Sequence, residues 1–170
     1  MKEQGIRKEY SKGDYFVRLN ERSRYVGYVE QGAFRYSCIH PEGKERIVGY
    51  AFEKEFAGDY TAFREQAFSH VDIQALCDST VYILTYEQTE QFFNATPGNQ
   101  YLGRRIAELL LAEVYERLIA VYSRSPEEQY LEILHRCPQL FNLISLKELS
   151  SYLRITPETL SRIRKKVVTS

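Results

Sequence analysis

The residues whose chemistry stands out lie near the C-terminal end of the chain, where lysine and arginine gather. The 170-residue sequence has 23 basic and 23 acidic residues, so it carries no net charge that would attract a polyanion. Residues 144–170, however, hold six basic and two acidic side chains, a local excess of +4. Guanidinium groups bind guanine edges and phosphates, ammonium groups attract phosphates, and short polar side chains donate to phosphate oxygens. This segment therefore has the chemistry of a surface that contacts nucleic acid.

Individual side chains of the segment suit different parts of a DNA duplex. Arg162 is expected to reach a guanine edge with its two-pronged guanidinium group, and Glu158 to accept from a cytosine amino group. Thr156 and Ser161 would touch phosphate, together with free N–H groups at a helix start. The cations that follow Arg162 would attract DNA of any sequence. The full set expected to contact DNA is Ser145, Thr156, Pro157, Glu158, Thr159, Ser161, Arg162, Arg164, Lys165 and Lys166.

Two short capped helices joined by a tight turn would position these side chains. Ser145 and Glu148 form a capping box, which starts a helix of about two turns. Arg154 and Ile155 make the turn, and Thr156 caps a second helix with Pro157 in its first position. The apolar side chains expected to face inward are Leu146, Leu149 and Leu153 in the first helix and Leu160, Ile163 and Val167 in the second. The pattern favours a helix-turn-helix over the alternative, a solvated basic helix at the end of the chain.

A long helix is expected upstream, over residues 102–122, after Thr96-Pro97-Gly98 breaks the chain. One apolar stripe repeats at spacings of 3 and 4, and a second group of apolar residues lies beside it. One small sheet face cannot cover so broad an apolar surface, which favours a helix that packs on a β-domain and on a second copy of itself. The alternative is the central core helix of a monomer. The stripe expected in the dimer contact is Ala107, Leu110, Val114, Leu118 and Val121.

The first half of the chain indicates β-structure. Short runs of strand-forming residues, such as 25–29, 33–39, 46–50, 71–75 and 80–84, are separated by Gly- or Pro-containing turns. This arrangement is typical of an antiparallel sandwich or barrel. Ser125, Pro126 and Glu128 cap a further helix that follows the long one, so a domain boundary is expected between these two helices.

Several other classes of protein are excluded by missing motifs. The sequence has three widely spaced Cys, no CxxC, no HExxH and no nucleotide-binding glycine loop, which argues against a zinc site, a disulfide framework and an enzyme. The N-terminal residues have no apolar segment of a secretory signal, and no apolar run approaches the ~20 residues that span a bilayer. A cytoplasmic protein that does not contact membranes is expected.

Taken together, these motifs resemble the Crp/Fnr superfamily of bacterial transcription regulators. The stretch 155–165 carries the most specific likeness, and 145–153 and 126–131 match the segments before it. In the β-half, 42–45 and 56–59 are similar to the hairpin turn and to the start of the phosphate-binding cassette of the family. The resemblance implies an α+β fold: an antiparallel, jelly-roll-like β-roll over residues 1–98, a dimerisation helix over 99–123 and a winged-helix-like helix-turn-helix over 124–170.

The sequence also departs from the family pattern. In members that respond to cAMP, the cassette has a Gly-Glu pair for the ribose and an Arg-Ser pair for the cyclic phosphate. Here Gly58-Asp59 stands at the first pair and Ser69-His70 at the second, so the bidentate arginine is missing and cAMP binding is not expected. No Cys cluster for an iron–sulfur centre is present near the N-terminus, and no cofactor is predicted. Arg154 stands where relatives often carry glycine, which predicts a left-handed residue costing ~1 kcal/mol. The N-terminal helices common in the family are expected to be absent, and the wing is expected to be minimal or absent.

The sequence therefore predicts a homodimeric, sequence-specific DNA-binding transcription regulator. Its expected partners are double-stranded DNA, a second copy of the chain and RNA polymerase, with an unidentified small-molecule effector bound near Gly58, Asp59, Ser69 and His70. The alternative is a β-roll that binds a ligand or another protein and whose C-terminal helices do not read DNA. An effector signal would tilt the paired helices near residues 110–121 and reset the distance between the two recognition helices to or from ~34 Å, one turn of DNA.

Overall fold

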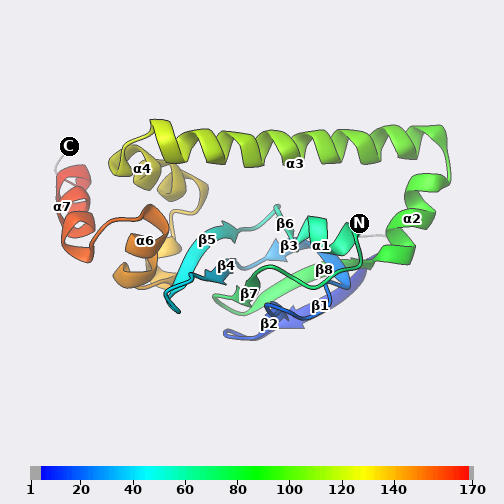
Figure 1. Ribbon diagram of the computed structural model, residues 1–170, viewed down its shortest axis with the longest axis horizontal. Coiled ribbons are helices and arrows are strands. Elements are labelled where there is room, and N and C mark those ends of the chain that lie inside the picture. The colour runs from blue at the N-terminus through cyan, green and yellow to red at the C-terminus, as the bar shows by residue number, and fades with distance from the viewer. Residues whose placement is uncertain (1–4, 169–170) are drawn as a thin grey trace.

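The computed structural model describes residues 5–168, and its β-half is built from two antiparallel four-stranded sheets (Figure 1). One sheet has the order β1-β8-β3-β6 and the other has the order β2-β7-β4-β5. The strands are β1 (Ile6–Tyr10), β2 (Tyr15–Val17), β3 (Tyr25–Gln31), β4 (Phe34–Ile39), β5 (Glu45–Ala51), β6 (Phe56–Ala57), β7 (Asp72–Ala75) and β8 (Ser79–Thr85). The predicted antiparallel β-roll is confirmed.

Aromatic side chains fill the space between the two sheets. Tyr10, Phe16 and Phe34 pack with ring centroids 5.6–6.1 Å apart, two of the three pairs in edge-to-face geometry. Val29 and Val81 are fully buried beside them. Alternation along the strands places every second side chain in this core, as the strand-forming runs of the sequence predicted.

Helices cover one side of the β-roll and extend beyond it. They are α1 (Tyr60–Arg64), α2 (Tyr86–Asn94), α3 (Pro97–Ser123), α4 (Pro126–Arg136), α5 (Leu140–Leu143), α6 (Leu146–Leu153) and α7 (Pro157–Val168). The expectation that α3 begins near residue 102 is wrong. Thr96 caps the helix and accepts from the N–H of Asn99 at 3.1 Å, so Pro97 occupies its first turn, where a missing N–H costs nothing.

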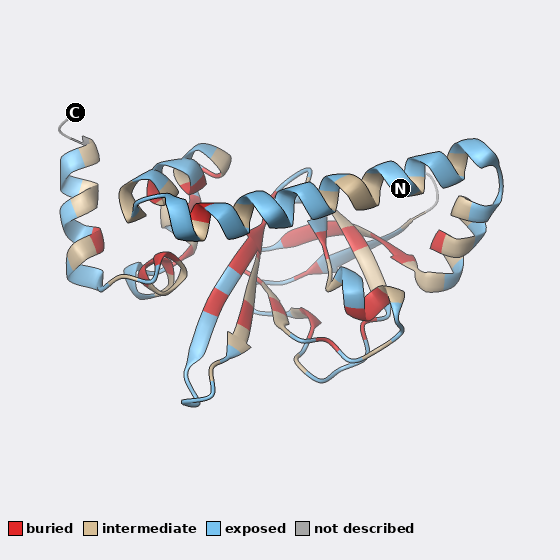
Figure 2. Ribbon diagram, turned by 45° about the horizontal axis from the view of Figure 1, so that its top comes forward, coloured by how far each residue is buried: buried red, intermediate tan, exposed pale blue. Residues whose placement is uncertain are grey.

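The long helix α3 runs beside the β-roll and carries little of the core (Figures 1 and 2). Among its described side chains only Ala120 is buried. Its 27 residues correspond to a length of about 40 Å. No helix within residues 5–168 is both long enough and apolar enough to cross a membrane.

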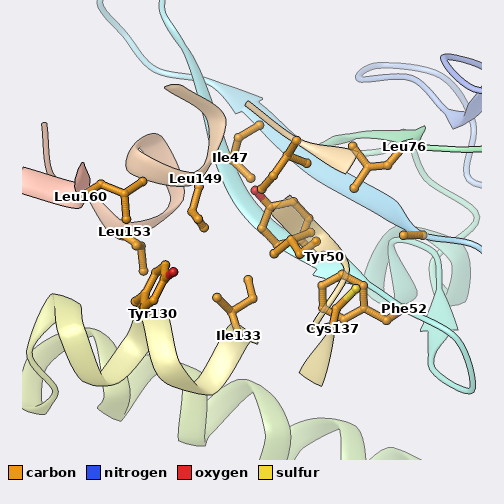
Figure 3. Close-up of a cluster of buried hydrophobic side chains, with 13 residues drawn as sticks. Ile47, Tyr50, Phe52, Leu76, Tyr130, Ile133, Cys137, Leu149, Leu153 and Leu160 are labelled. Carbon is orange, nitrogen blue, oxygen red and sulfur yellow. The ribbon is translucent and has the colours of Figure 1, made fainter. Parts of the chain in front are cut away.

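The helices after α3 do not form a core of their own. Leu149, Leu153 and Leu160 from α6 and α7 belong to the same buried cluster as Ile47 and Tyr50 of β5 (Figure 3). The predicted boundary at residue 124 coincides with the turn between α3 and α4, but apolar packing continues across it. The helical unit is therefore docked on the edge strand β5 of the β-roll.

Candidate nucleic-acid interface

The two capped helices predicted near the C-terminus are α6 and α7. Ser145 accepts from the N–H of Glu148 at 3.2 Å, and the Glu148 carboxylate accepts from the N–H of Ser145 at 2.8 Å, so the capping box is complete. Arg154 ends α6 in the left-handed region at φ 57°, as predicted. Thr156 then accepts from the N–H of Thr159 at 3.3 Å at the start of α7. This turn fixes the angle at which α7 leaves α6.

α7 has one face in the core and one face toward solvent. Leu160 is fully buried, and Ile163 and Val167 are half-buried against the same cluster. The inward-facing stripe of α7 is therefore confirmed. In α6, Leu149 and Leu153 are buried as predicted, but Leu146 is 40% exposed, because the inner face of this short helix runs through Leu149, Ser150 and Leu153. The side chains of α7 and its cap that lie exposed are Thr156, Pro157, Glu158, Ser161, Arg162, Lys165 and Lys166.

Two of the predicted cations are engaged within the chain. The guanidinium carbon of Arg164 lies 5.0 Å from the centre of the Phe141 ring. Burial raises the pKa of Tyr130, and the neighbouring Arg164 opposes this shift. Lys166 donates to the Glu127 carboxylate of α4 at 2.8 Å, although its side chain is still two-thirds exposed. Arg164 thus holds α7 against the domain, whereas Arg162 extends from the exposed face.

The acidic residue of the exposed face is also ordered by its surroundings. Glu158 lies in the first turn of α7, and hydrogen bonds from its own backbone N–H and from Thr156 hold the pKa of this carboxyl below its ordinary value. A carboxylate in the first turn is stabilised by the positive end of the helix dipole. Glu158 therefore presents an ionised acceptor beside Arg162.

The first helix of the pair is anchored to the β-roll at its N-terminal end. Arg35 of β4 donates to the Glu148 carboxylate at 2.5 Å, and the same guanidinium binds the side-chain oxygen of Gln74 at 2.7 and 3.1 Å. Burial opposes ionisation of Glu148, but hydrogen bonds from Ser145 and the charge of Arg35 outweigh it and hold the pKa below its ordinary value. No motif in the sequence signals this contact, because the partners lie 113 positions apart.

A second ion pair joins the helical unit to the β-roll. Arg136, at the end of α4, donates to both oxygens of Glu55 at 2.9 Å and lies 5.1 Å from the centre of the Phe52 ring. Ile47 of β5 donates its N–H to the Ser151 hydroxyl of α6 at 3.4 Å. These contacts surround the shared apolar cluster and fix the orientation of α6 and α7.

The four residues of the predicted effector pocket do lie close together, but their polar groups are already engaged within the chain. Asp59 caps α1 by accepting from Ala62 N–H at 3.1 Å, and it accepts from the N–H of His70 at 2.9 Å. The His70 ring nitrogen Nδ1 also lies 2.9 Å from the Asp59 carboxylate. Ser69 is buried and donates its hydroxyl to the carbonyl of Val71 at 2.8 Å. The cassette therefore closes on itself.

Tyr36 of β4 completes this closure and was not singled out by the sequence. Its hydroxyl accepts from the N–H of Gly58 at 3.1 Å and donates to the carbonyl of Phe56 at 3.5 Å. Burial raises the pKa of Tyr36 to about 12. A neutral phenol thus occupies the backbone donor of Gly58, and no motif in the sequence signals this role.

The predicted dimer stripe on α3 is partly exposed. Val114 and Leu118 are exposed, and Ala107, Leu110 and Val121 are half-buried. Leu111, beside the stripe, is 70% exposed, and Tyr122, near the C-terminal end of α3, is 85% exposed. Within residues 5–168, no cluster of three or more His, Cys, Asp or Glu side chains has an arrangement suited to a metal ion.

Known proteins share this sequence pattern and this fold. The Cyclic nucleotide-binding domain family matches residues 7–96. A protein of Rhizobium leguminosarum bv. viciae described as a transcriptional activator is 25% identical over 92% of this chain and 68% of its own length.

Solved structures match almost the whole chain. FixK2 from Bradyrhizobium japonicum superposes with a TM-score of 0.77 at 18% identity, covering 97% of this chain and 85% of FixK2. A protein from Eubacterium rectale assigned to the Crp/Fnr family of transcriptional regulators gives 0.73 at 14% identity, covering 99% and 80%. The catabolite activator protein of Thermus thermophilus gives 0.57 at 19% identity, covering 98% and 80%. The chain therefore belongs to the cyclic nucleotide-binding domain family and has the fold of the Crp/Fnr-type transcription regulators.

Proposed function

We propose that the chain is a homodimeric transcription regulator that binds double-stranded DNA through α7. The observation that carries this proposal is the division of α7 into two faces. Leu160 is fully buried, whereas Glu158, Ser161 and Arg162 are exposed, and α7 stands at the end of the molecule farthest from α2 (Figure 1). A short helix held by its apolar face, with polar and basic groups outward, suits insertion into the major groove.

Base recognition is assigned to Arg162 and Glu158. The guanidinium fork of Arg162 matches the two acceptors of guanine, and an ionised Glu158 accepts from a cytosine amino group. Thr156, Pro157, Thr159, Ser161, Lys165 and Lys166 lie around these two side chains and contribute contacts to the sugar-phosphate backbone. Arg164 packs on Phe141, so it adds to the local positive potential without contacting DNA directly.

The second copy of the chain is assigned to the exposed face of α3. Most charged side chains of this helix pair with one another, as Arg104 and Arg105 bind Glu108 at 2.9 and 2.6 Å and Arg117 binds Glu113. What remains along about 40 Å of helix is largely apolar, and a soluble monomer rarely leaves so large an apolar surface uncovered. Pairing of two such helices would bury the stripe from Ala107 to Val121 and place the two α7 helices on one side of the dimer.

Signal transfer would use the junction between the β-roll and the helical unit. A small molecule bound at the β-roll changes DNA affinity only if it binds the two orientations of the helices with different affinity. The docked α6 offers one such orientation, fixed by Arg35, Arg136 and the shared cluster. Because Asp59 and His70 bind each other and Tyr36 holds Gly58, cAMP is not assigned as the effector. RNA polymerase is the expected protein partner of a DNA-bound regulator of this type.

The test is DNA binding measured by fluorescence anisotropy, with a labelled duplex selected from a random-sequence pool. The wild-type protein is expected to bind with an affinity that falls steeply between about 50 and 200 mM salt. Arg162→Ala should lose base preference, whereas the control Arg105→Ala, in the N-terminal half of α3 and far from α7 in the chain, should bind as the wild type does. Absence of any selected sequence, or binding without salt dependence, would favour the alternative, a β-roll whose C-terminal helices do not read DNA.

A further inference from the structure

A hollow of about 460 Å³ opens where strand β2 of one sheet meets strand β3 of the other. Its floor includes Phe16 and Val17, which are less than 10% exposed, and Tyr25 and Phe68 line its sides. Pockets at the mouths of β-structures that combine an apolar floor with a few polar groups are common ligand sites. The cassette residues Gly58, Asp59, Ser69 and His70 do not line this hollow.

Two arginines stand at the rim. Arg22 and Arg24 flank the buried Ser23, and both are exposed. Neither forms an ion pair with any residue between positions 5 and 168. The guanidinium of Arg22 lies 5.8 Å from the centre of the Phe68 ring. An adjoining hollow of about 490 Å³ is lined by the same two arginines, so both cations face open space on either side.

The carboxylates near the rim leave the arginines available. Glu21 lines the first hollow, and one of its oxygens accepts from the N–H of Arg18 at 3.2 Å. Glu87 lines only the adjoining hollow. The first hollow therefore carries two cations and one partly satisfied carboxylate above an apolar floor.

The loop that carries the arginines is held rigidly. Asn20 donates its N–H to the Ser69 carbonyl at 2.9 Å, Ser69 donates to Glu21 at 2.7 Å, and Ser23 donates to Ala67 at 3.1 Å. The Ser23 hydroxyl also lies 3.3 Å from the carbonyl of Asp59. A site whose backbone is already fixed loses little conformational freedom when a ligand binds. The same hydrogen bonds connect this loop to the cassette.

A neighbour of Phe16 in the floor carries a buried donor. Tyr10 packs on Phe16 with ring centroids 5.8 Å apart, and its hydroxyl is buried with no hydrogen-bond partner in the part of the chain that the structure describes. An unsatisfied buried hydroxyl costs free energy that a nearby acceptor can recover. The ammonium of Lys8 lies 4.9 Å from the same ring, which adds a third cation at this end of the sandwich.

We propose that this hollow binds a small organic carboxylate with an aromatic or aliphatic body. The body packs on Phe16, Val17 and Phe68, and the carboxylate is held between Arg22 and Arg24. The site lies on the outer side of the loop that supports the cassette. Binding there does not depend on whether α7 reads DNA, so the two proposals can be tested separately.

The probes are phenylacetate and octanoate, with neutral phenylacetamide as the matched control. Binding to the full chain is measured by ligand-detected saturation-transfer NMR and by titration of protein amide resonances. Saturable binding of a carboxylate in the range of about 10 mM or tighter is expected, with phenylacetamide at least about tenfold weaker. The shifted amide signals should come from residues 16–25 and 66–69.

Variants then assign the binding to the arginines. Arg22→Gln and Arg24→Gln should each raise the Kd for phenylacetate at least about tenfold. The control variant is Arg18→Gln. Arg18 is in the same loop, but its guanidinium stacks on Tyr15 and does not line the hollow, so its removal should change the Kd less than about twofold. No saturable binding of either carboxylate, equal binding of phenylacetamide, or equal effects of the three variants in proteins with unchanged melting temperatures would overturn the proposal.

Discussion

Replacing Glu148 by glutamine tests whether the ion pair between α6 and the β-roll stabilises the docked helices. Glu148 caps α6 through Ser145 with one oxygen and binds Arg35 with the other. Glutamine keeps an acceptor for the cap but turns an amide donor toward the guanidinium. The chain supplies a matched control in α4, where Glu128 forms the same capping box with Ser125, at 2.7 Å, and no salt bridge with any described residue.

The expected loss follows from the exposure of the pair. Arg35 and Glu148 are 19% and 28% exposed, so the pair lies between a surface ion pair, worth ~0–1 kcal/mol, and a buried one, whose disruption costs ~3–5 kcal/mol. Arg35 retains its bonds to Gln74 and its contact with Glu45 at 3.5 Å, which compensates part of its charge. Glu148→Gln should therefore lower the free energy of unfolding by about 1–2 kcal/mol, and Glu128→Gln by less than about 0.5 kcal/mol.

The assay is urea unfolding at neutral pH, followed by circular dichroism at one fixed protein concentration, since the stability of the proposed dimer would depend on concentration. In thermal unfolding at the same protein concentration, the melting temperature of Glu148→Gln should fall by about 2–8 °C. A double-mutant cycle with Arg35→Gln should give a coupling free energy of about 1 kcal/mol or more. Equal losses for Glu148→Gln and Glu128→Gln, with coupling near zero, would show that the Arg35–Glu148 ion pair does not stabilise the docked helices.

Further perturbations address the interface, the dimer, the turn and the response to acid. Arg162→Ala should flatten base preference, whereas Lys166→Ala should weaken binding to all DNA sequences alike and lower the slope of affinity against salt by about one unit. Fluorescence anisotropy across operator variants measures both effects. The reverse pattern would contradict the assignment of Arg162 to bases and Lys166 to phosphates. Leu118→Glu should convert the proposed dimer to monomer in sedimentation experiments, because it places a charge in the proposed apolar contact of α3; an unchanged molecular mass would remove α3 from the interface. Arg154→Gly should leave the free energy of unfolding unchanged or raise it by up to ~1 kcal/mol, since glycine adopts φ 57° without strain, and a clear loss in urea unfolding would argue against that strain. The pKa of Glu148 lies below its ordinary 4.5, so the ionised carboxylate stabilises the fold above that pH. This contribution is lost as the pH falls through the lower, folded-state pKa. The stability difference between wild type and Glu148→Gln should therefore shrink below about pH 4.5, and a difference that stays constant would show that it does not come from ionisation of Glu148.

Features that depend on neighbours in the chain were predictable from the sequence. The capping boxes at Ser125 and Ser145 and the left-handed Arg154 follow from a few adjacent residues, and the structure has all three. The antiparallel β-roll followed from alternation and turn residues. The start of α3 was misplaced because Thr96-Pro97-Gly98 favours both a break and a helix N-terminus, and the hydrogen bond from Asn99 decides between them.

Features that depend on distant partners were not predictable. The continuity of the helical unit with the β-roll rests on Tyr50 and Leu149, which nothing in a single sequence pairs. The same limit applies to the closed cassette. The sequence showed that an arginine is missing at Ser69, but it gave no sign that the Tyr36 hydroxyl would bind the N–H of Gly58.

Footprinting on a selected duplex tests most directly whether two copies of α7 read DNA together. Hydroxyl-radical cleavage of that duplex, bound by the full chain, should show two protected half-sites whose centres lie about 34 Å apart, one helical turn, on the same face of the DNA. Arg162→Ala should remove the sequence-specific protection at both half-sites. Protection of a single half-site, or a duplex cleaved evenly throughout, would contradict a dimer that places two recognition helices in successive major grooves.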